Sequence, residues 1–195
     1  MTTVNGRWQK AARLVTELST PAAVNTVIPL IIGAHVGSAP WGFIVSLCSG
    51  IIPMAYIAGG IRVSRISDHH VTERAQRPAV MAFILGTLLV GLLAEVLLSA
   101  PADVVALTCA MVATLLALAV VTVVVHWKIS VHTAVAAGSV VMLATALGGA
   151  WLLLLVLVPV VMWSRVELDD HSPSQVLAGA VLGAALAGAA FALLR

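Results

Sequence analysis

The sequence predicts an all-α, polytopic transmembrane bundle of six or seven helices. Apolar residues make up 61% of the 195 residues and only 9% are charged, whereas a soluble domain carries about 25% charged residues. The apolar residues also stand in long runs, and residues 79–98 and 104–125 both reach the ~20 residues that a helix needs to cross a bilayer. Continuous runs favour helices over a barrel, whose strands would alternate.

Seven apolar segments follow one another, and six is the alternative count because three of them are short. They are residues 22–36, 41–61, 79–98, 104–125, 133–147, 150–161 and 175–194. Residues 1–20 are polar and partly basic, lack a signal-peptide pattern, and can form an amphipathic helix at the membrane interface. We expect residues 21–195 to form one membrane domain.

The connections between these segments fall into two classes. Residues 38–40, 100–102 and 148–149 are short and uncharged, whereas residues 62–78, 126–132 and 164–174 hold nearly all the remaining charges. Two crossings separate each polar loop from the next, and an even number of crossings returns the chain to the same side. We therefore expect all three polar loops on one membrane face.

The first polar loop, residues 62–78, presents His70, Arg74 and Arg77. Arginine is a good phosphate ligand because its planar fork can donate two parallel hydrogen bonds. The alternative is that these cations only set the membrane topology.

The second polar loop, residues 126–132, carries Lys128, Ser130 and His132 at the expected start of a helix. Unpaired N–H groups and the positive dipole end make such a helix start suitable for an anion. The ordinary pKa of histidine lies near neutrality, which suits His132 to proton transfer. The alternative is that Trp127 and Lys128 only anchor a helix end at the interface.

The third polar loop, residues 164–174, ends at another predicted helix start, with Ser172 as N-cap and Pro173 at the first helical position. His171 stands just before it and could attack phosphorus as a neutral imidazole. Taken alone, this loop could be a polar turn. Together, three loops that bring Arg, Lys or His to one face indicate a phosphate-handling site.

The three clusters resemble the signature of the type 2 phosphatidic acid phosphatase superfamily of membrane lipid phosphatases. That signature reads Lys-x6-Arg-Pro, then Pro-Ser-Gly-His, then Ser-Arg-x5-His-x3-Asp. The first motif is matched at its end, the second in part and the third up to its histidine, by Arg77-Pro78, Ser130-x-His132 and Ser164-Arg165-x5-His171.

The resemblance implies a metal-independent phosphatase that needs no cofactor. His171 would be the nucleophile and form a phosphohistidine, and His132 would protonate the leaving oxygen. Arg77, Ser130 and Arg165 would bind the phosphate oxygens and stabilise charge in the transition state.

The chain departs from the signature in all three motifs. His70 stands where the family has lysine, and Arg74 or Lys128 could supply the missing charge. Ile129 and Val131 stand where the family has proline and glycine.

Gln175 stands where the family has the aspartate that orients the nucleophilic histidine. An amide oxygen can accept the ring N–H but brings no charge, so we expect retained geometry and slower chemistry. Asp169 or Asp170 could also supply the carboxylate.

Every Lys and Arg except Arg195 lies before the first segment or on the motif face. Because Lys and Arg in short loops mark the cytoplasmic side, we expect an active face in the cytoplasm, in a bacterial plasma membrane. A phosphatidate, a phosphatidylglycerol phosphate or a polyprenyl (di)phosphate would fit as substrate, with the polyprenyl compound slightly favoured. Membrane lipids are then the expected surroundings. The net charge of +2 gives no reason to expect a nucleic acid partner, and the oligomeric state is left open.

Three other functions remain as alternatives. The first is a catalytically impaired relative that binds lipid phosphate. The second is a small transporter, for which Glu95 and Asp103 are the candidate membrane carboxylates. The third is a Mg²⁺-dependent transferase, although Asp68, Asp169 and Asp170 are few for paired aspartate-rich loops.

Overall fold

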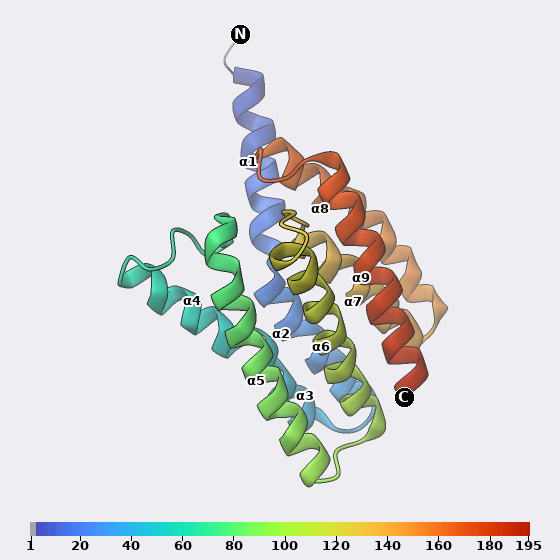
Figure 1. Ribbon diagram of the computed structural model, residues 1–195. Coiled ribbons are helices and arrows are strands. Elements are labelled where there is room, and N and C mark those ends of the chain that lie inside the picture. The colour runs from blue at the N-terminus through green and yellow to red at the C-terminus, as the bar shows by residue number, and fades with distance from the viewer. Residues whose placement is uncertain (1–2) are drawn as a thin grey trace.

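The computed structural model describes residues 3–195, which contain helices and loops but no β-strand. Within these described residues, nine α-helices follow one another along the chain (Figure 1). They are α1 (Thr3–Leu18), α2 (Pro21–His35), α3 (Ala39–Ser46), α4 (Ile52–Arg62), α5 (Arg77–Leu97), α6 (Ala102–Val123), α7 (Val131–Leu147), α8 (Leu157–Glu167) and α9 (Pro173–Leu194).

Shorter helical turns join some of these helices into longer rods. A π-helical turn, Leu47–Ile51, links α3 to α4, and Pro53 follows it, so the wider turn accommodates a residue that cannot donate a backbone hydrogen bond. A 3₁₀ helix, Gly149–Val156, runs into α8, and a 3₁₀ turn, Arg74–Gln76, precedes α5.

Five helical stretches among the described residues are long and apolar enough to cross a membrane. They are Ala39–Arg62, Arg74–Leu97, Ala102–Val123, Gly149–Glu167 and Pro173–Leu194. The pair Gly6–Leu18 and Pro21–His35, bent by 44°, is a sixth candidate, and α7 is a shorter apolar helix. The predicted class, an all-α membrane bundle, is confirmed, and all seven predicted segments are helical.

Helix α9 packs mainly against α7 and α6. Gly183 makes the approach to α7 possible, because a methyl group at this position would collide with the backbone of Ala134. A methyl group at Gly179 would likewise collide with the carbonyl oxygen of Ser130 and the hydroxyl of Thr133. The two glycines, four residues apart, therefore form a close helix contact of the small-residue type. The hydroxyl of Thr133 donates to the carbonyl of Val176 at 2.8 Å. These contacts hold the first turns of α7 and α9 side by side.

Helix α1 forms where an amphipathic helix was predicted and extends beyond the bundle, at a bend of 44° to α2 (Figure 1). It packs on α8, with Trp8 edge-on to Trp163 at 6.0 Å between ring centroids. The hydroxyl of Thr16 also donates to Ser164 at 3.1 Å. Leu14 and Leu18 stay exposed, so the predicted position at the membrane interface remains a prediction.

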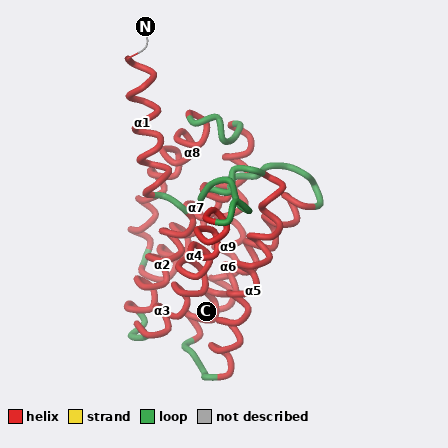
Figure 2. Tube along the Cα trace, turned by 90° about the vertical axis from the view of Figure 1, so that its left-hand side faces the viewer, coloured by secondary structure: helices red, strands yellow, loops and turns green. Residues whose placement is uncertain are grey.

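The three polar loops lie at one end of the bundle, as the crossing count predicts. Arg77 donates to the carbonyl of Ile129 at 3.0 Å, and His171 contacts the carbonyl of Lys128 at 3.0 Å, so the second loop touches both of the others. Figure 2 shows these longer loops gathered near α1 and the short turns at the opposite end. At that opposite end Arg195 pairs with Asp103 at 3.2 Å.

Candidate active site

The start of α9 presents His171 at the bundle end where the polar loops meet. Ser172 is the N-cap, Pro173 lies in the first turn, and Ser172 and Gln175 form a capping box. The backbone N–H of Ser172 donates to Gln175 Oε1 at 3.1 Å, and the backbone N–H of Gln175 donates to Ser172 Oγ at 3.4 Å. The predicted helix start is confirmed, and it fixes the backbone on both sides of the His171 side chain.

Two acceptors hold the His171 ring. Nδ1 lies 3.0 Å from the carbonyl oxygen of Lys128 and 3.2 Å from Gln175 Oε1. Because both partners are acceptors, Nδ1 carries the proton and donates, and Nε2 keeps its lone pair. Burial lowers the pKa of His171 to about 3, with help from Arg77, Arg165 and Lys128, while the bond to Gln175 acts in the opposite direction. The ring is therefore neutral at physiological pH.

Neither nearby aspartate takes over the orienting role that was considered for it. Asp170 Oδ2 instead pairs with Arg165 Nη2 at 3.0 Å. Asp169 is exposed and has a left-handed backbone conformation. Gln175 Oε1 and the backbone carbonyl of Lys128 are the two contacts of His171 Nδ1, and the orienting role of Gln175 stays a prediction.

Arg165 is a buried cation with spare hydrogen-bond donors. Its side chain is 1% exposed, and Nε and Nη1 have no hydrogen-bond partner among the described residues. Asp170 holds only Nη2. Buried polar groups are normally paired, so the two spare N–H groups indicate a place for an anion.

Arg77 is also buried, but backbone carbonyls hold it. Its Nε donates to Val71 at 3.1 Å and its Nη1 to Ile129 at 3.0 Å. No carboxylate among the described residues pairs with it, so its charge is free to act on an anion. Val71 has a positive φ of 49°, an unusual conformation for a β-branched residue, and its carbonyl is the one that Arg77 binds.

His132 lies in the first turn of α7 and is 4% exposed. Its Nε2 has no hydrogen-bond partner among the described residues. Ser130 is the N-cap of α7, where its Oγ accepts from the backbone N–H of Thr133 at 3.5 Å. The structure thus brings both residues of the second motif to the helix start that was predicted for them.

His70 reaches the cluster from the first loop. Its ring centroid lies 5.2 Å from that of His132, and its Nδ1 is buried without a partner. Burial lowers its pKa, as do His69 and Arg165, while Glu17 raises it. Lys128 is half-buried, and burial and Arg77 lower the pKa of its ammonium.

The structure does not bring Arg74 into the cluster, contrary to the expectation that it compensates for His70. Arg74 starts a separate 3₁₀ turn before α5, is exposed, and donates from Nη1 to the carbonyl of His126 at 2.6 Å. It links the first and second loops at the surface instead.

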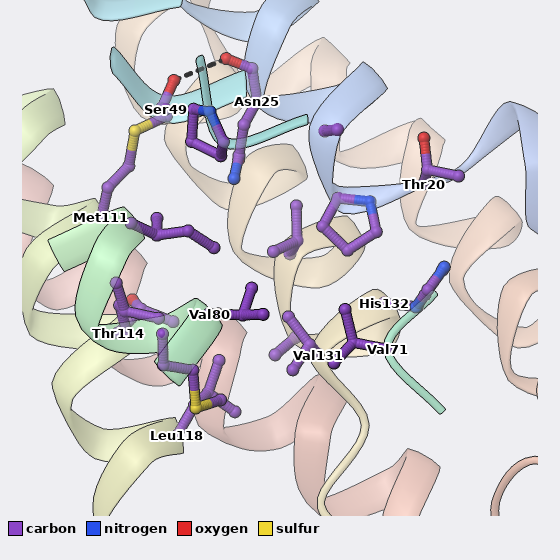
Figure 3. Close-up of a pocket in the computed structure, with 18 of the residues that line it drawn as sticks. Thr20, Asn25, Ser49, Val71, Val80, Met111, Thr114, Leu118, Val131 and His132 are labelled. Carbon is purple, nitrogen blue, oxygen red and sulfur yellow. Dashed lines mark hydrogen bonds between the residues drawn. The ribbon is translucent and has the colours of Figure 1, made fainter. Parts of the chain in front are cut away.

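An apolar cavity of about 150 Å³ opens beside the histidines. His69, His70, Arg77 and His132 line its polar part. The rest is lined largely by apolar side chains of α5, α6 and α7, among them Met81, Leu88, Met111, Leu118 and Met142. Figure 3 shows His132 on one side of the cavity and Met111, Thr114 and Leu118 on the other.

Sequence reasoning missed this cavity, the Lys128 carbonyl and the Arg165–Asp170 pair. A cavity between apolar helices and a backbone acceptor leave no signal in residue types. Asp170 stands five residues after Arg165, and this spacing could have indicated their ion pair. The family signature instead suggested Asp170 as a possible partner for His171.

A comparison with known protein families gives one match: residues 128–195 match the family model of the PAP2 superfamily. The match covers the second and third motifs and helices α7–α9, and it confirms the family resemblance seen in the motifs. No curated protein and no solved structure gave a significant match. The PAP2 match and the long apolar helices support a membrane phosphatase in general.

Proposed function

We propose that the chain is an integral membrane lipid phosphatase that hydrolyses a phosphate monoester or diphosphate of a lipid through a phosphohistidine. The observation that carries the proposal is a set of buried nitrogen atoms without partners. They are Arg165 Nε and Nη1, His132 Nε2 and His70 Nδ1, all buried and unpaired among the described residues. A phosphoryl group supplies the oxygens that the two N–H groups of Arg165 need.

The nucleophile in this mechanism is Nε2 of His171. Its lone pair attacks phosphorus, the N–P bond forms, and the bond from phosphorus to the lipid oxygen breaks. The ring becomes cationic in this step, and the Lys128 carbonyl and Gln175 Oε1, which already accept its Nδ1–H, stabilise the added charge.

His132 handles the proton. Its imidazolium form protonates the lipid oxygen as that oxygen leaves, and the neutral ring that results then takes a proton from the water that attacks the phosphohistidine. The N–P bond breaks in this second step, and inorganic phosphate and a neutral His171 result.

Arg165 and Arg77 bind the phosphoryl oxygens, with Ser130, His70 and Lys128 contributing further donors. Arg165 is well suited because Asp170 anchors one end of its guanidinium and leaves the other end unpaired. We do not include Arg74, whose side chain lies outside the cluster.

The apolar cavity beside His70, Arg77 and His132 supports a lipid phosphate as substrate. A phosphate at the histidines leaves an attached hydrocarbon chain next to Met81, Leu88 and Met111, which line the apolar part. A polyprenyl phosphate stays slightly favoured over a phosphatidate or a phosphatidylglycerol phosphate. We propose that the site faces the cytoplasm of a bacterial cell, since the cations gather at this end.

A panel of these three lipid phosphates, incubated with purified protein in detergent, tests the proposal. We expect phosphate release that persists in EDTA and disappears in His171→Ala. His126→Ala is the matched control, because His126 lies in the exposed second loop. Release that survives in His171→Ala, or that EDTA abolishes, contradicts the mechanism.

A further inference from the structure

A second cluster of metal-ligating side chains lies at the edge of the candidate active site. Nε2 of His69 is 3.0 Å from Glu17 Oε1, and Nε2 of His70 is 3.2 Å from the same oxygen. One ligand atom from each of the three residues lies within 4.8 Å of the others. The mechanism above uses neither Glu17 nor His69.

We propose that Glu17, His69 and His70 form a binding site for a divalent transition-metal ion of the Zn²⁺ class. Two imidazoles and one carboxylate are a ligand set that zinc takes in proteins with an open fourth position. Bond lengths of about 2.0–2.2 Å place two ligands of a tetrahedral ion about 3.3–3.6 Å apart. The N···O separations of 3.0 and 3.2 Å are slightly shorter, so a small outward shift of the side chains would admit the ion.

The local fold prepares the two histidines for this task. Asp68 Oδ1 accepts the backbone N–H of His70 at 2.8 Å and the hydroxyl of Thr72 at 3.1 Å. These bonds fix the turn so that the adjacent rings lie 4.0 Å apart between centroids. Glu17 meets them from the last turn of α1, more than fifty residues earlier in the chain.

The cluster is reachable from solvent. The side chain of Glu17 is 52% exposed and that of His69 is 39% exposed, whereas His70 is 14% exposed. His69 and His70 also line the cavity that holds Arg77 and His132. An ion can therefore enter from the water side.

Metal binding joins α1 to the first polar loop and also defines the protonation of His70. With Nε2 on the metal, the ring proton must sit on Nδ1. That nitrogen is buried and unpaired beside His132, so the bound ion makes His70 a fixed donor toward the proposed phosphate position. This second consequence rests on the proposed function, whereas the metal site itself does not.

Binding can be measured without any activity assay. The full chain, without a histidine tag, is stripped with EDTA in detergent and titrated with Co²⁺ and then Zn²⁺, using the visible absorption of tetrahedral Co²⁺ and calorimetry. We expect one ion per chain and a higher Tm with Zn²⁺. Glu17→Gln and His69→Gln should each weaken binding by at least about tenfold, since even outer-shell changes cost 10–100-fold.

Two matched controls keep the test specific. Glu73→Gln removes an exposed carboxylate of the same loop, and His126→Ala removes an exposed imidazole of another loop; both should bind Co²⁺ as the unmodified chain does. No Co²⁺ or Zn²⁺ binding, or binding that Glu17→Gln and His69→Gln leave unchanged, overturns the inference. Either result leaves the phosphatase proposal to be judged on the His171→Ala assay.

Discussion

Both site residues of the third polar loop have a side-chain partner close by in sequence, whereas the first polar loop relies more on contacts with distant parts of the chain. His171 contacts Gln175, four residues away, as well as the more distant carbonyl of Lys128, and Arg165 pairs with Asp170, five residues away. Arg77 instead binds the carbonyl of Ile129, and His70 contacts Glu17, both more than fifty residues away in sequence. The family match includes the third loop and stops short of the first.

This difference shows which of the two loops can be recognised from its own sequence. A helix start with a capping box builds its own geometry, so its sequence pattern is recognisable. A loop that depends on carbonyls and side chains from elsewhere carries less of its geometry in its own residues, so its pattern is harder to recognise.

The largest effect should come from the third loop, at Arg165. We expect Arg165→Ala to lower kcat by about 10²–10³-fold, as is typical when one donor to transition-state charge is removed. Steady-state phosphate release measures it. Asp170→Asn should cost less, because the guanidinium stays in place and only its anchor weakens. An Arg165→Ala variant with full turnover would show that Arg165 does not bind the phosphoryl group.

In the first polar loop, we expect Arg77→Lys to lower both the turnover and the thermal stability of the protein. Lysine cannot bind the carbonyls of Val71 and Ile129 with the same fork, and an unsatisfied buried acceptor costs about 1–3 kcal/mol. Thermal unfolding in detergent and turnover should therefore both decline. A variant that loses turnover alone would mean that Arg77 does not tie the two loops together.

Acid should destabilise the protein through His171. Its pKa is lowered from 6.5 to about 3 in the folded chain, so the unfolded state binds the proton first as the pH falls. This contribution to stability is present above pH 6.5 and is lost between about 6.5 and 3. Tm measured across that range should fall less steeply in His171→Asn, and equal slopes would contradict the burial of a neutral His171.

Gln175→Asp should have a smaller and opposite effect on turnover. Gln175 Oε1 already accepts from His171 Nδ1 and from the backbone of Ser172. Aspartate is one methylene shorter, but its carboxylate still offers an acceptor on the side of His171 Nδ1 and adds negative charge near the ring that becomes cationic, so kcat should be kept or raised. Complete loss of turnover with an unchanged Tm would show that Gln175 does not fill the orienting position.

Arg74→Ala should have the smallest effect. Its side chain is exposed, and its one hydrogen bond among the described residues goes to the carbonyl of His126. Surface substitutions usually change stability by no more than about 0.5 kcal/mol, and turnover should change by a similarly small factor. A loss comparable to that of Arg165→Ala would return Arg74 to the phosphate site.

The sequence was sufficient for the fold class, the meeting of the three loops and the start of α9. Long apolar runs, an even number of crossings and the Ser172–Gln175 cap are local signals with direct physical meaning. The positions of Arg74 and Asp170 could not be predicted, because several acceptors compete for each of them and only the packed fold decides. The cavity depends on side-chain packing among α5, α6 and α7, which apolar runs do not encode.

Trapping of the proposed intermediate tests the central claim most directly. The protein is mixed with a ³²P-labelled lipid phosphate, quenched in base and digested, and the labelled peptide is sequenced. The account predicts an acid-labile, base-stable label on His171 that is absent in His171→Ala. A label on another residue, or phosphate release with no label under conditions that trap a control phosphohistidine, would contradict it.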